Sequence, residues 1–249
     1  MKINKQSNLY TIIYVAVIVL IVGAALAITS LSLKDRQQAN IDADKMRQIL
    51  ASVHISGEGD NIISSFEKTI IAQRVYDATG RQAGDNAFAV DVAAESKKSD
   101  SERQLPVYIA DLDGAIKFII PLYGSGLWGP IWGYIAFDAD CSTIFGAYFA
   151  HQGETPGLGA EIAKPAFSDQ FDGKQVWHDG RFIPVDVVKK GMKPAEGADY
   201  VDGISGGTIT SRGVASMIAN CLTPYQDILK NLSNEFSHGA EKQYPKRIS

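Results

Sequence analysis

The sequence has few cysteines and lacks the patterns that build metal clusters or phosphate-binding loops. Its two cysteines, Cys141 and Cys221, stand far apart, and neither belongs to a CxxC or Cys/His pattern. A zinc site or an iron–sulfur cluster therefore cannot be built from this chain alone, and we expect two buried free thiols. No GxxxxGKS or GxxxxGKT run occurs either, which leaves a P-loop nucleotide site without support.

The sequence also lacks an excess of positive charge. Its 249 residues have a net charge of −4, with 45% hydrophobic and 21% charged residues. This composition is typical of a globular protein and offers no broad basic surface for phosphate backbones, so we expect no nucleic-acid partner. The length suits one ordinary domain with additional segments.

Charge is missing altogether from Leu9 to Leu33, where Ile, Val, Leu and Ala dominate. As a helix, this run of about 25 residues is roughly 37 Å long, enough to cross a bilayer. A cleaved signal peptide is the alternative, favoured by Lys2, Lys5 and the triplet Ala25-Leu26-Ala27, but the run is long for such a segment. We expect a retained anchor. Basic residues lie on both sides of it, so charge alone does not decide its orientation.

Helical spacing follows the anchor. Asp42–Val53 has an apolar face and predicts a surface helix, and Asn61–Val75 resembles a second helix. The polar stretch Ala94–Arg103 is typical of an exposed loop. We therefore expect residues 34–101 to form a helical connecting region.

The pattern then changes to short apolar runs of period two, which predict β-hairpins. Their strands are expected at Leu105–Ala110 with Ala115–Tyr123, at Ile131–Phe137 with Ser142–Ala150, and, more weakly, within Lys174–Val188. A short helix interrupted by Pro165 is expected at Ala160–Phe171, and a helical pattern through Val214, Met217, Ile218 and Leu222 follows Ser211. Consecutive hairpins flanked by helices predict an α+β fold, with one transmembrane helix followed by a soluble domain that has a mostly antiparallel sheet.

Two glycine-rich segments are candidates for binding. In the first, residues 123–133, Trp128 and Trp132 stand among four glycines and offer a stacking face to a flat ligand, or else belong to the core. In the second, residues 151–159, Pro156-Gly157 suits the centre of a type II turn, so an ordinary strand-to-helix turn is the alternative. Gly157-Leu158-Gly159 lacks the third glycine of a dinucleotide fingerprint, and the antiparallel setting is wrong for one.

The third segment, Asp202–Ser211, is a flexible loop that ends in hydroxyl groups where a helix begins. Free backbone N–H groups and the helix dipole favour an anion such as phosphate at that point. A simple N-cap by Ser or Thr is the alternative explanation.

These three segments together resemble a known family. Ser205-Gly206-Gly207-Thr208-Ile209-Thr210-Ser211, preceded by Asp202, is similar to the flavinylation motif of the NqrC component of the sodium-translocating NADH:quinone reductase and of the RnfG component of the Rnf electron-transport complex. Glu154–Gly159 resembles the family's second signature, and Gly126-Leu127-Trp128-Gly129 its third. The anchor and the order of the segments also match, so the resemblance covers nearly the whole chain.

The resemblance implies an FMN joined covalently to the Thr208 hydroxyl through a phosphoester. Gly207 stands where alanine is usual, which removes no required functional group. The resemblance further implies that Thr155 and Leu158 lie against the isoalloxazine, with Glu154 near its polar edge. Ser205, Gly206, Gly207 and Gly159 complete the expected site, and Trp128 is our own additional candidate for a ring contact.

The family also implies partners and a location. A separate flavin transferase with FAD as donor and a need for magnesium would attach the FMN, and the chain would join the other subunits in the bacterial inner membrane with its soluble domain in the periplasm. Within the chain we expect a tail at 1–8, the anchor at 9–33, the connecting region at 34–101, the FMN-binding domain at 102–236 and a tail at 237–249. The segment Asp35–Ser101 favours the quinone reductase over the shorter Rnf relative. A membrane-anchored binding or assembly module without covalent flavin is the alternative from another class.

Overall fold

A computed structural model describes residues 8–56, 61–194 and 197–237 of the chain. The chain divides into two compact units, Met1–Lys45 and Met46–Ser249. Most of the tails expected at 1–8 and 237–249 lies outside the described residues.

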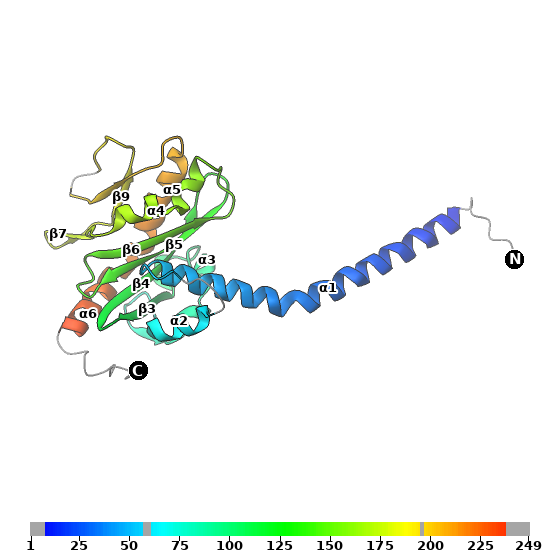
Figure 1. The fold of residues 1–249 in the computed structure, drawn as a ribbon, viewed down its shortest axis with the longest axis horizontal. Coiled ribbons are helices and arrows are strands. Elements are labelled where there is room, and N and C mark those ends of the chain that lie inside the picture. Colours follow the sequence, from blue (N-terminus) through cyan, green and yellow to red (C-terminus); the bar gives the residue numbers. More distant parts are fainter. Residues whose placement is uncertain (1–7, 57–60, 195–196, 238–249) are drawn as a thin grey trace. The chain divides into compact units, whose positions relative to one another are not determined.

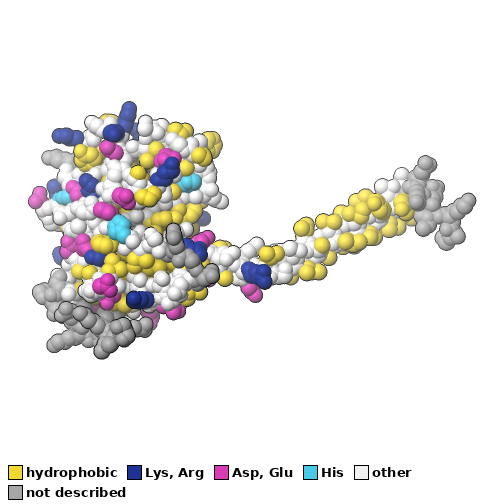
Figure 2. Space-filling model, in the orientation of Figure 1, with side chains coloured by type: hydrophobic (Ala, Val, Ile, Leu, Met, Phe, Trp, Pro, Cys, Tyr) yellow, Lys and Arg dark blue, Asp and Glu magenta, His cyan; other side chains and the backbone are white. Residues whose placement is uncertain are grey.

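The first unit is helical. Helix α1 spans Asn8–Ala51, and Figure 2 shows hydrophobic side chains along its length. Of the described residues, only this helix is long and apolar enough to cross a membrane. The anchor expected at Leu9–Leu33 and the helix expected at Asp42–Val53 are therefore one continuous element. Its last turn is not a surface turn, because Ile49 and Leu50 are buried in the second unit.

The second unit is built on a six-stranded sheet in the order β2-β1-β3-β4-β5-β6, in which all neighbours are antiparallel (Figure 1). The strands are β1 Ile70–Tyr76, β2 Gln82–Gly84, β3 Leu105–Leu112, β4 Ala115–Ser125, β5 Pro130–Asp138 and β6 Ile144–His151. The two predicted hairpins are β3–β4 and β5–β6. The α+β fold with a mostly antiparallel sheet is confirmed.

Both faces of the sheet are covered. Alternate residues of the central strands, such as Phe118, Ile120 and Leu122 on β4, join a core with α5 (Thr208–Leu222) and α6 (Gln226–Ser237). The other face meets the end of α1, where Trp132 Nε1 donates to Gln48 Oε1 over 2.9 Å, and helix α2 (Ile62–Thr69). This two-sided burial holds the strands rigid and gives the loops at their ends a fixed base.

The expected helix at Asn61–Val75 is wrong in its second half. Helix α2 ends at Thr69, and β1 begins at Ile70 and pairs with β3. Its sequence, Ile-Ile-Ala-Gln-Arg-Val-Tyr, is rich in β-branched and aromatic residues, and its cross-strand partners outweigh the helical spacing that precedes it. Residues 34–101 are thus not wholly helical, because they contribute β1 and β2 to the sheet.

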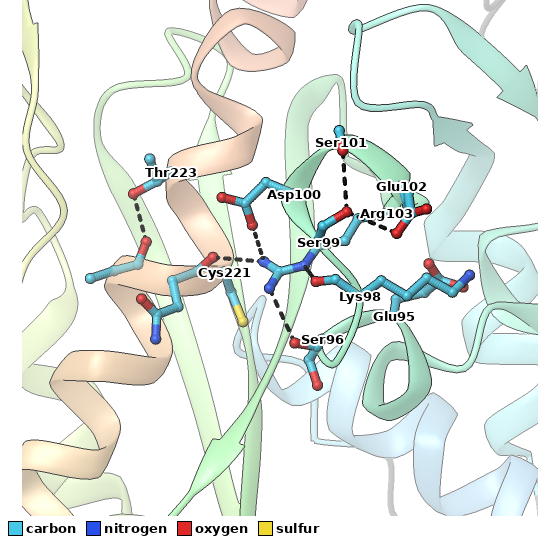
Figure 3. Close-up of polar contacts among 12 residues, drawn as sticks. Glu95, Ser96, Lys98, Ser99, Asp100, Ser101, Glu102, Arg103, Cys221 and Thr223 are labelled. Atoms are coloured by element: carbon cyan, nitrogen blue, oxygen red, sulfur yellow. Dashed lines mark hydrogen bonds and ion pairs between the residues drawn. The ribbon is translucent and has the colours of Figure 1, made fainter.

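The polar stretch Ala94–Arg103 is mostly exposed, as expected, but it is not a free loop. It contains the end of α3 (Val92–Glu95) and the 3-10 turn η2 (Asp100–Glu102). Arg103 holds this stretch in place. Its guanidinium donates to the carbonyl oxygens of Ser96 and Lys98 and pairs with Asp100 (Figure 3). It also donates to the carbonyl oxygen of Asn220. Because Asn220 lies in the last turn of α5, this side chain ties the segment to that helix.

The rest of the unit is short elements around α5. The 3-10 turn η3 (Gly159–Ala163), α4 (Pro165–Ser168) and the 3-10 turn η4 (Asp169–Phe171) replace the single helix expected at Ala160–Phe171. Strands β7 (Trp177–His178) and β8 (Arg181–Phe182) form the weak third hairpin, whereas β9 (Asp186–Val188) pairs in parallel with β10 (Tyr200–Asp202). The chain then passes from α5 through the 3-10 turn η5 (Thr223–Tyr225) into α6. Cys141 and Cys221 are free thiols, the first buried and the second partly so.

Candidate functional site

The three glycine-rich segments meet at the N-terminal end of α5. Residues 126–129 connect β4 to β5 in a tight loop, closed by a hydrogen bond from Gly126 N to Gly129 O of 2.8 Å. Residues 152–159 follow β6, and residues 203–207 connect β10 to α5. Segments separated by up to about 80 positions in the sequence are therefore brought together by the hairpins and by the return of the chain along α5.

Glu154 joins the three segments. Its carboxylate is buried, with 5% of the residue exposed. One oxygen, Oε1, accepts from Trp128 N over 2.9 Å, and the other, Oε2, accepts from Thr210 Oγ1 over 2.6 Å. Burial opposes ionisation, but these bonds, together with one from the backbone N–H of Leu127 and the nearby His151, hold the pKa of the Glu154 carboxyl below its ordinary value.

Two glycines make room for this carboxylate. A Cβ on Gly126 would overlap with Oε1 of Glu154, and one on Gly159 would overlap with Oε2 and lie 2.5 Å from Thr210 Oγ1. Close backbone approach, and not a positive φ, requires glycine at both positions. A Cβ on Gly206 would in turn lie 2.6 Å from Leu158 Cδ2, so the second and third segments touch.

Of the hydroxyl groups near the start of α5, those of Thr208 and Ser205 belong to exposed residues. Thr210 and Ser211 are buried, at 1% and 5% exposed, and both hydroxyls serve the fold. Thr210 donates to Glu154, and Ser211 Oγ accepts from Ile204 N over 2.9 Å. The N-cap of α5 is Gly207, with no side-chain capping bond, so Thr208 occupies the first helical position and is not a simple cap.

Thr208 borders two cavities. One has a volume of about 860 Å³ and is lined by Ser205, Gly206 and Thr208, by the basic Lys164, Lys189 and Lys190, and by Phe167 and Gln170 among others. The other, of about 450 Å³, shares Lys189, Gly203, Ile204 and Thr208 and adds Lys193 and Arg212. Gln170 and Asp202 both line the first cavity, and the Gln170 amide holds this wall because it donates to the carbonyl of Asp202 and accepts from the N–H of Asp202.

Of the other predicted site residues, Thr155, Leu158, Gly159, Trp128 and Gly207 line neither cavity, whereas the neighbouring Gly157 lines the first. Leu158 N donates to Thr155 O over 3.1 Å, and Gly157 has a φ of +76°, which forms the turn predicted for Pro156-Gly157. Thr155, Leu158 and Trp128 are exposed, the last to 68%. Trp128 is therefore not a core residue. Gly207 is buried beside Gly159.

The sequence did not single out Lys164, Lys189, Lys190, Lys193 and Arg212 around Thr208. They come from the weakly patterned 160–193 region and from the solvent side of α5, where a lysine or arginine is ordinary. The Lys189-Lys190 pair directly after an apolar strand was the one available signal. The bond between Thr210 and Glu154 was also missed, because the two residues are 56 positions apart.

Comparison with known proteins gives the class of this site. A family model described as the FMN-binding domain matches residues 126–223, which contain all three segments. This part of the chain is therefore similar to an FMN-binding domain.

Proteins of similar sequence identify a narrower family. The NqrC component of the Na(+)-translocating NADH-quinone reductase of Vibrio alginolyticus is 31% identical over 234 residues, covering 86% of this chain and 90% of that one. The corresponding protein of Pseudomonas aeruginosa is 30% identical over 242 residues, covering 86% and 91%. This chain belongs to the NqrC family of the Na(+)-translocating NADH-quinone reductase, which confirms the resemblance and favours it over the Rnf alternative.

Solved structures of NqrC proteins are similar to this chain in fold. The NqrC of Parabacteroides distasonis superimposes with a TM-score of 0.75 at 46% identity, covering 79% of this chain and 96% of that one. The NqrC of Shewanella oneidensis gives a TM-score of 0.65 at 25% identity, covering 81% and 100%. The soluble unit thus has the NqrC fold.

Proposed function

We propose that this chain is the FMN-carrying electron-transfer subunit of a sodium-translocating NADH:quinone reductase, with FMN held by a phosphoester to Thr208. Family membership supports the first part. The second part rests above all on one observation: Thr208 is an exposed hydroxyl residue at the edge of a cavity lined by lysines, whereas Thr210 and Ser211 nearby are buried and bonded.

The residues present fit an FMN. A cavity of about 860 Å³ lies within the range of small-molecule and cofactor sites. Lys189 and Lys190 supply positive charge for a phosphate on Thr208, and Arg212 does so from the other side. Lys164 also lines the cavity, where it pairs with Glu161 over 2.7 Å. For the ring we propose Thr155 and Leu158, together with Trp128 as a stacking face, because all three are exposed beside the acceptor loop.

Bound FMN supplies the ability to accept and pass on electrons one at a time. The chain supplies position: Thr208 prevents loss of the carrier, and the lysines offset the charge of the phosphate. Apolar side chains around the ring restrict water and so contribute to its potential. The chain alone is expected to turn over no substrate; the chemistry requires the other subunits of the membrane complex.

Attachment requires a separate transferase, which we propose uses FAD and magnesium. The Thr208 Oγ forms a bond to the phosphorus on the riboflavin side of FAD, the bond between the two phosphates breaks, AMP leaves and the hydroxyl proton is released. For this attachment the chain needs no base of its own, and no residue of the cavity has a catalytic role in it.

The acceptor can be tested with Thr208→Ala, coexpressed with the transferase. We expect a folded, membrane-bound and colourless protein, since loss of an exposed hydroxyl costs at most about 1–2 kcal/mol. Thr208→Ser keeps the hydroxyl and is expected to retain flavin. Ser205→Ala is the matched control, because Ser205 is exposed on the same loop, and it should leave the covalent bond intact.

The measurement is in-gel flavin fluorescence after denaturation, with peptide mass mapping. Flavin that persists in Thr208→Ala, or maps to Ser205, would show that the acceptor is another residue. A wild-type chain without covalent flavin in the presence of active transferase would favour the alternative, a membrane-anchored binding or assembly module.

The ring position has its own test. Replacing Thr155 or Leu158 should change the absorption or the redox potential of the flavin without abolishing its attachment. In Trp128→Ala, the flavin fluorescence should be quenched less than in the wild-type protein. Wild-type spectra and potentials in all three variants would mean that the ring does not lie against these residues.

A further inference from the structure

Glu154 occupies a position in which a neutral side chain would not serve equally well. Two donors, the backbone N–H of Trp128 and the hydroxyl of Thr210, point at its two carboxylate oxygens. An amide offers only one oxygen to these donors, so a glutamine must turn its NH₂ group toward one of them. The close approach of Gly126 and Gly159 leaves little space for the carboxylate to move.

The charge is also favourably placed. Thr210 is the third residue of α5, so the carboxylate that it contacts lies against the first turn of a helix of 15 residues. A negative charge there is stabilised by the helix dipole. The lowered pKa of Glu154 agrees with a carboxylate that remains ionised at neutral pH.

These contacts constrain the acceptor. Thr208 lies two residues before Thr210 in the same helical turn, and the loop before it packs on Leu158 through Gly206 and on Gly159 through Gly207. The bond between Thr210 and Glu154 therefore sets the position of the first turn of α5 along the helix axis and its rotation about that axis. It thereby also sets the direction of the Thr208 side chain.

We propose that Glu154 is a positioning residue for flavin attachment: its buried carboxylate locks the first turn of α5 against the other two segments and so holds the Thr208 hydroxyl in the orientation that the transferase requires. This role is an alternative to the contact with the polar edge of the ring that the family resemblance implies. It rests on the proposed function, because it concerns how Thr208 becomes an acceptor. The carboxylate oxygens of Glu154 bond to Trp128 N and Thr210 Oγ1, so Glu154 acts on Thr208 through the first turn of α5.

The experiment measures the initial rate of flavin attachment to the purified, detergent-solubilised full chain, with transferase, FAD and Mg²⁺, by mass spectrometry. Glu154→Gln and Thr210→Val should each lower the kcat for this chain as substrate by about tenfold or more, because a displaced nucleophile loses much of the benefit of orientation. KM should change little, since the surface of the loop is kept. Thr210→Ser retains the hydroxyl and should restore the rate.

The control is Glu95→Gln. Glu95 is another buried glutamate, which accepts from Lys98 Nζ and from Gln104 N far from the acceptor loop. It should lower the melting temperature without changing the rate of attachment. The double variant Glu154→Gln/Thr210→Val should be no slower than the slower single variant, since both remove one interaction.

The possible failures are distinguishable. If wild-type chain and Thr208→Ala take up flavin equally, or neither does, the proposed function fails. If wild-type chain is modified at Thr208 but both variants are modified at the wild-type rate, the positioning role is overturned. A rate that falls in Thr210→Val and is not restored by Thr210→Ser would also overturn it, as would an equal fall in Glu95→Gln.

Discussion

Gly159 and Gly153 lie in the same segment but have opposite surroundings. A Cβ on Gly159 would overlap with the Glu154 carboxylate, whereas one on Gly153 would meet nothing within 4 Å. We therefore expect Gly159→Ala to lower the free energy of unfolding by about 1–3 kcal/mol, the usual cost of overpacking, and to slow flavin attachment. Gly153→Ala should do neither. Thermal unfolding of the two variants checks this, and equal melting temperatures would contradict the packing described for Glu154.

The ionisation of Glu154 predicts a pH dependence. Because its folded pKa is below the ordinary value, its contribution to stability is fully present above the pKa of the unfolded chain and is lost as the pH falls through the folded pKa. The difference in stability between wild-type and Glu154→Gln should thus be constant above about pH 5.5 and shrink below the ordinary glutamate pKa of about 4.3. Denaturant unfolding at several pH values measures it. A difference that persists unchanged into acid would show that shape, and not charge, matters.

The sequence predicted which segments come together better than it predicted the contacts between them. The three segments were selected by their glycines and by their family resemblance, and the fold brings them together. That Glu154 is buried could not be read locally, because it depends on a donor 56 positions away. The lysines around Thr208 were missed for a similar reason: only the path of the chain places them beside the cavity.

Among the elements, α5 is held at both ends by different parts of the chain. Glu154 contacts its first turn, and Arg103 donates to Asn220 O in its last. Arg103→Ala removes three hydrogen bonds to carbonyl groups and a partly buried ion pair. We expect a loss of about 1–3 kcal/mol, as for other hydrogen bonds made by charged groups. Lys97→Ala, an exposed residue of the same segment, is the control.

Hydrogen exchange distinguishes a local effect of Arg103 on these segments from a general loss of stability. In Arg103→Ala, residues 96–103 and the last turn of α5 should exchange faster, while β4 and β5 remain protected. Uniformly faster exchange throughout the sheet would contradict a local role for Arg103.

The elements show what pattern alone can predict. The hairpins β3–β4 and β5–β6 were found because their strands are long, apolar and separated by turn residues such as Asp113-Gly114. Strand β1 was mistaken for helix because it follows α2 without a break, and its identity depends on pairing with β3, whose sequence lies some 30 residues later. Likewise, no local signal separates the parallel pair β9–β10 from a hairpin strand.

At the scale of the molecule, the second compact unit begins at Met46. A chain starting at Met46 keeps Ile49, Leu50 and Val53, all at most 2% exposed, and should be soluble and folded. A chain starting at Asn61 loses them and should be less stable, by about 1.5–3 kcal/mol for each buried aliphatic side chain. Circular dichroism melting compares the two. Equal stability would mean that the last turn of α1 is dispensable.

The remaining prediction concerns the membrane. None of the apolar stretch of α1 is buried, so in water it would expose a continuous hydrophobic surface. We expect α1 to be retained as a single transmembrane anchor, with the soluble unit in the periplasm as in the family resemblance. In spheroplasts, added protease should then degrade the soluble unit while a cytoplasmic marker protein stays intact, and the chain should resist extraction by salt or carbonate.

A cleaved signal peptide and a retained anchor differ in the expected amino terminus of the mature chain and in its extraction from the membrane. These two differences provide a test of the anchor. Cleavage after Ala27 would leave a mature amino terminus at Ile28, release the protein into the periplasmic fraction by salt, and still leave the soluble unit accessible to protease. Amino-terminal sequencing of the membrane-bound chain, together with carbonate extraction, therefore separates the two where protease alone does not. Protection of the soluble unit in intact spheroplasts, with the anchor retained, would reverse the proposed topology and place the acceptor Thr208 on the cytoplasmic side.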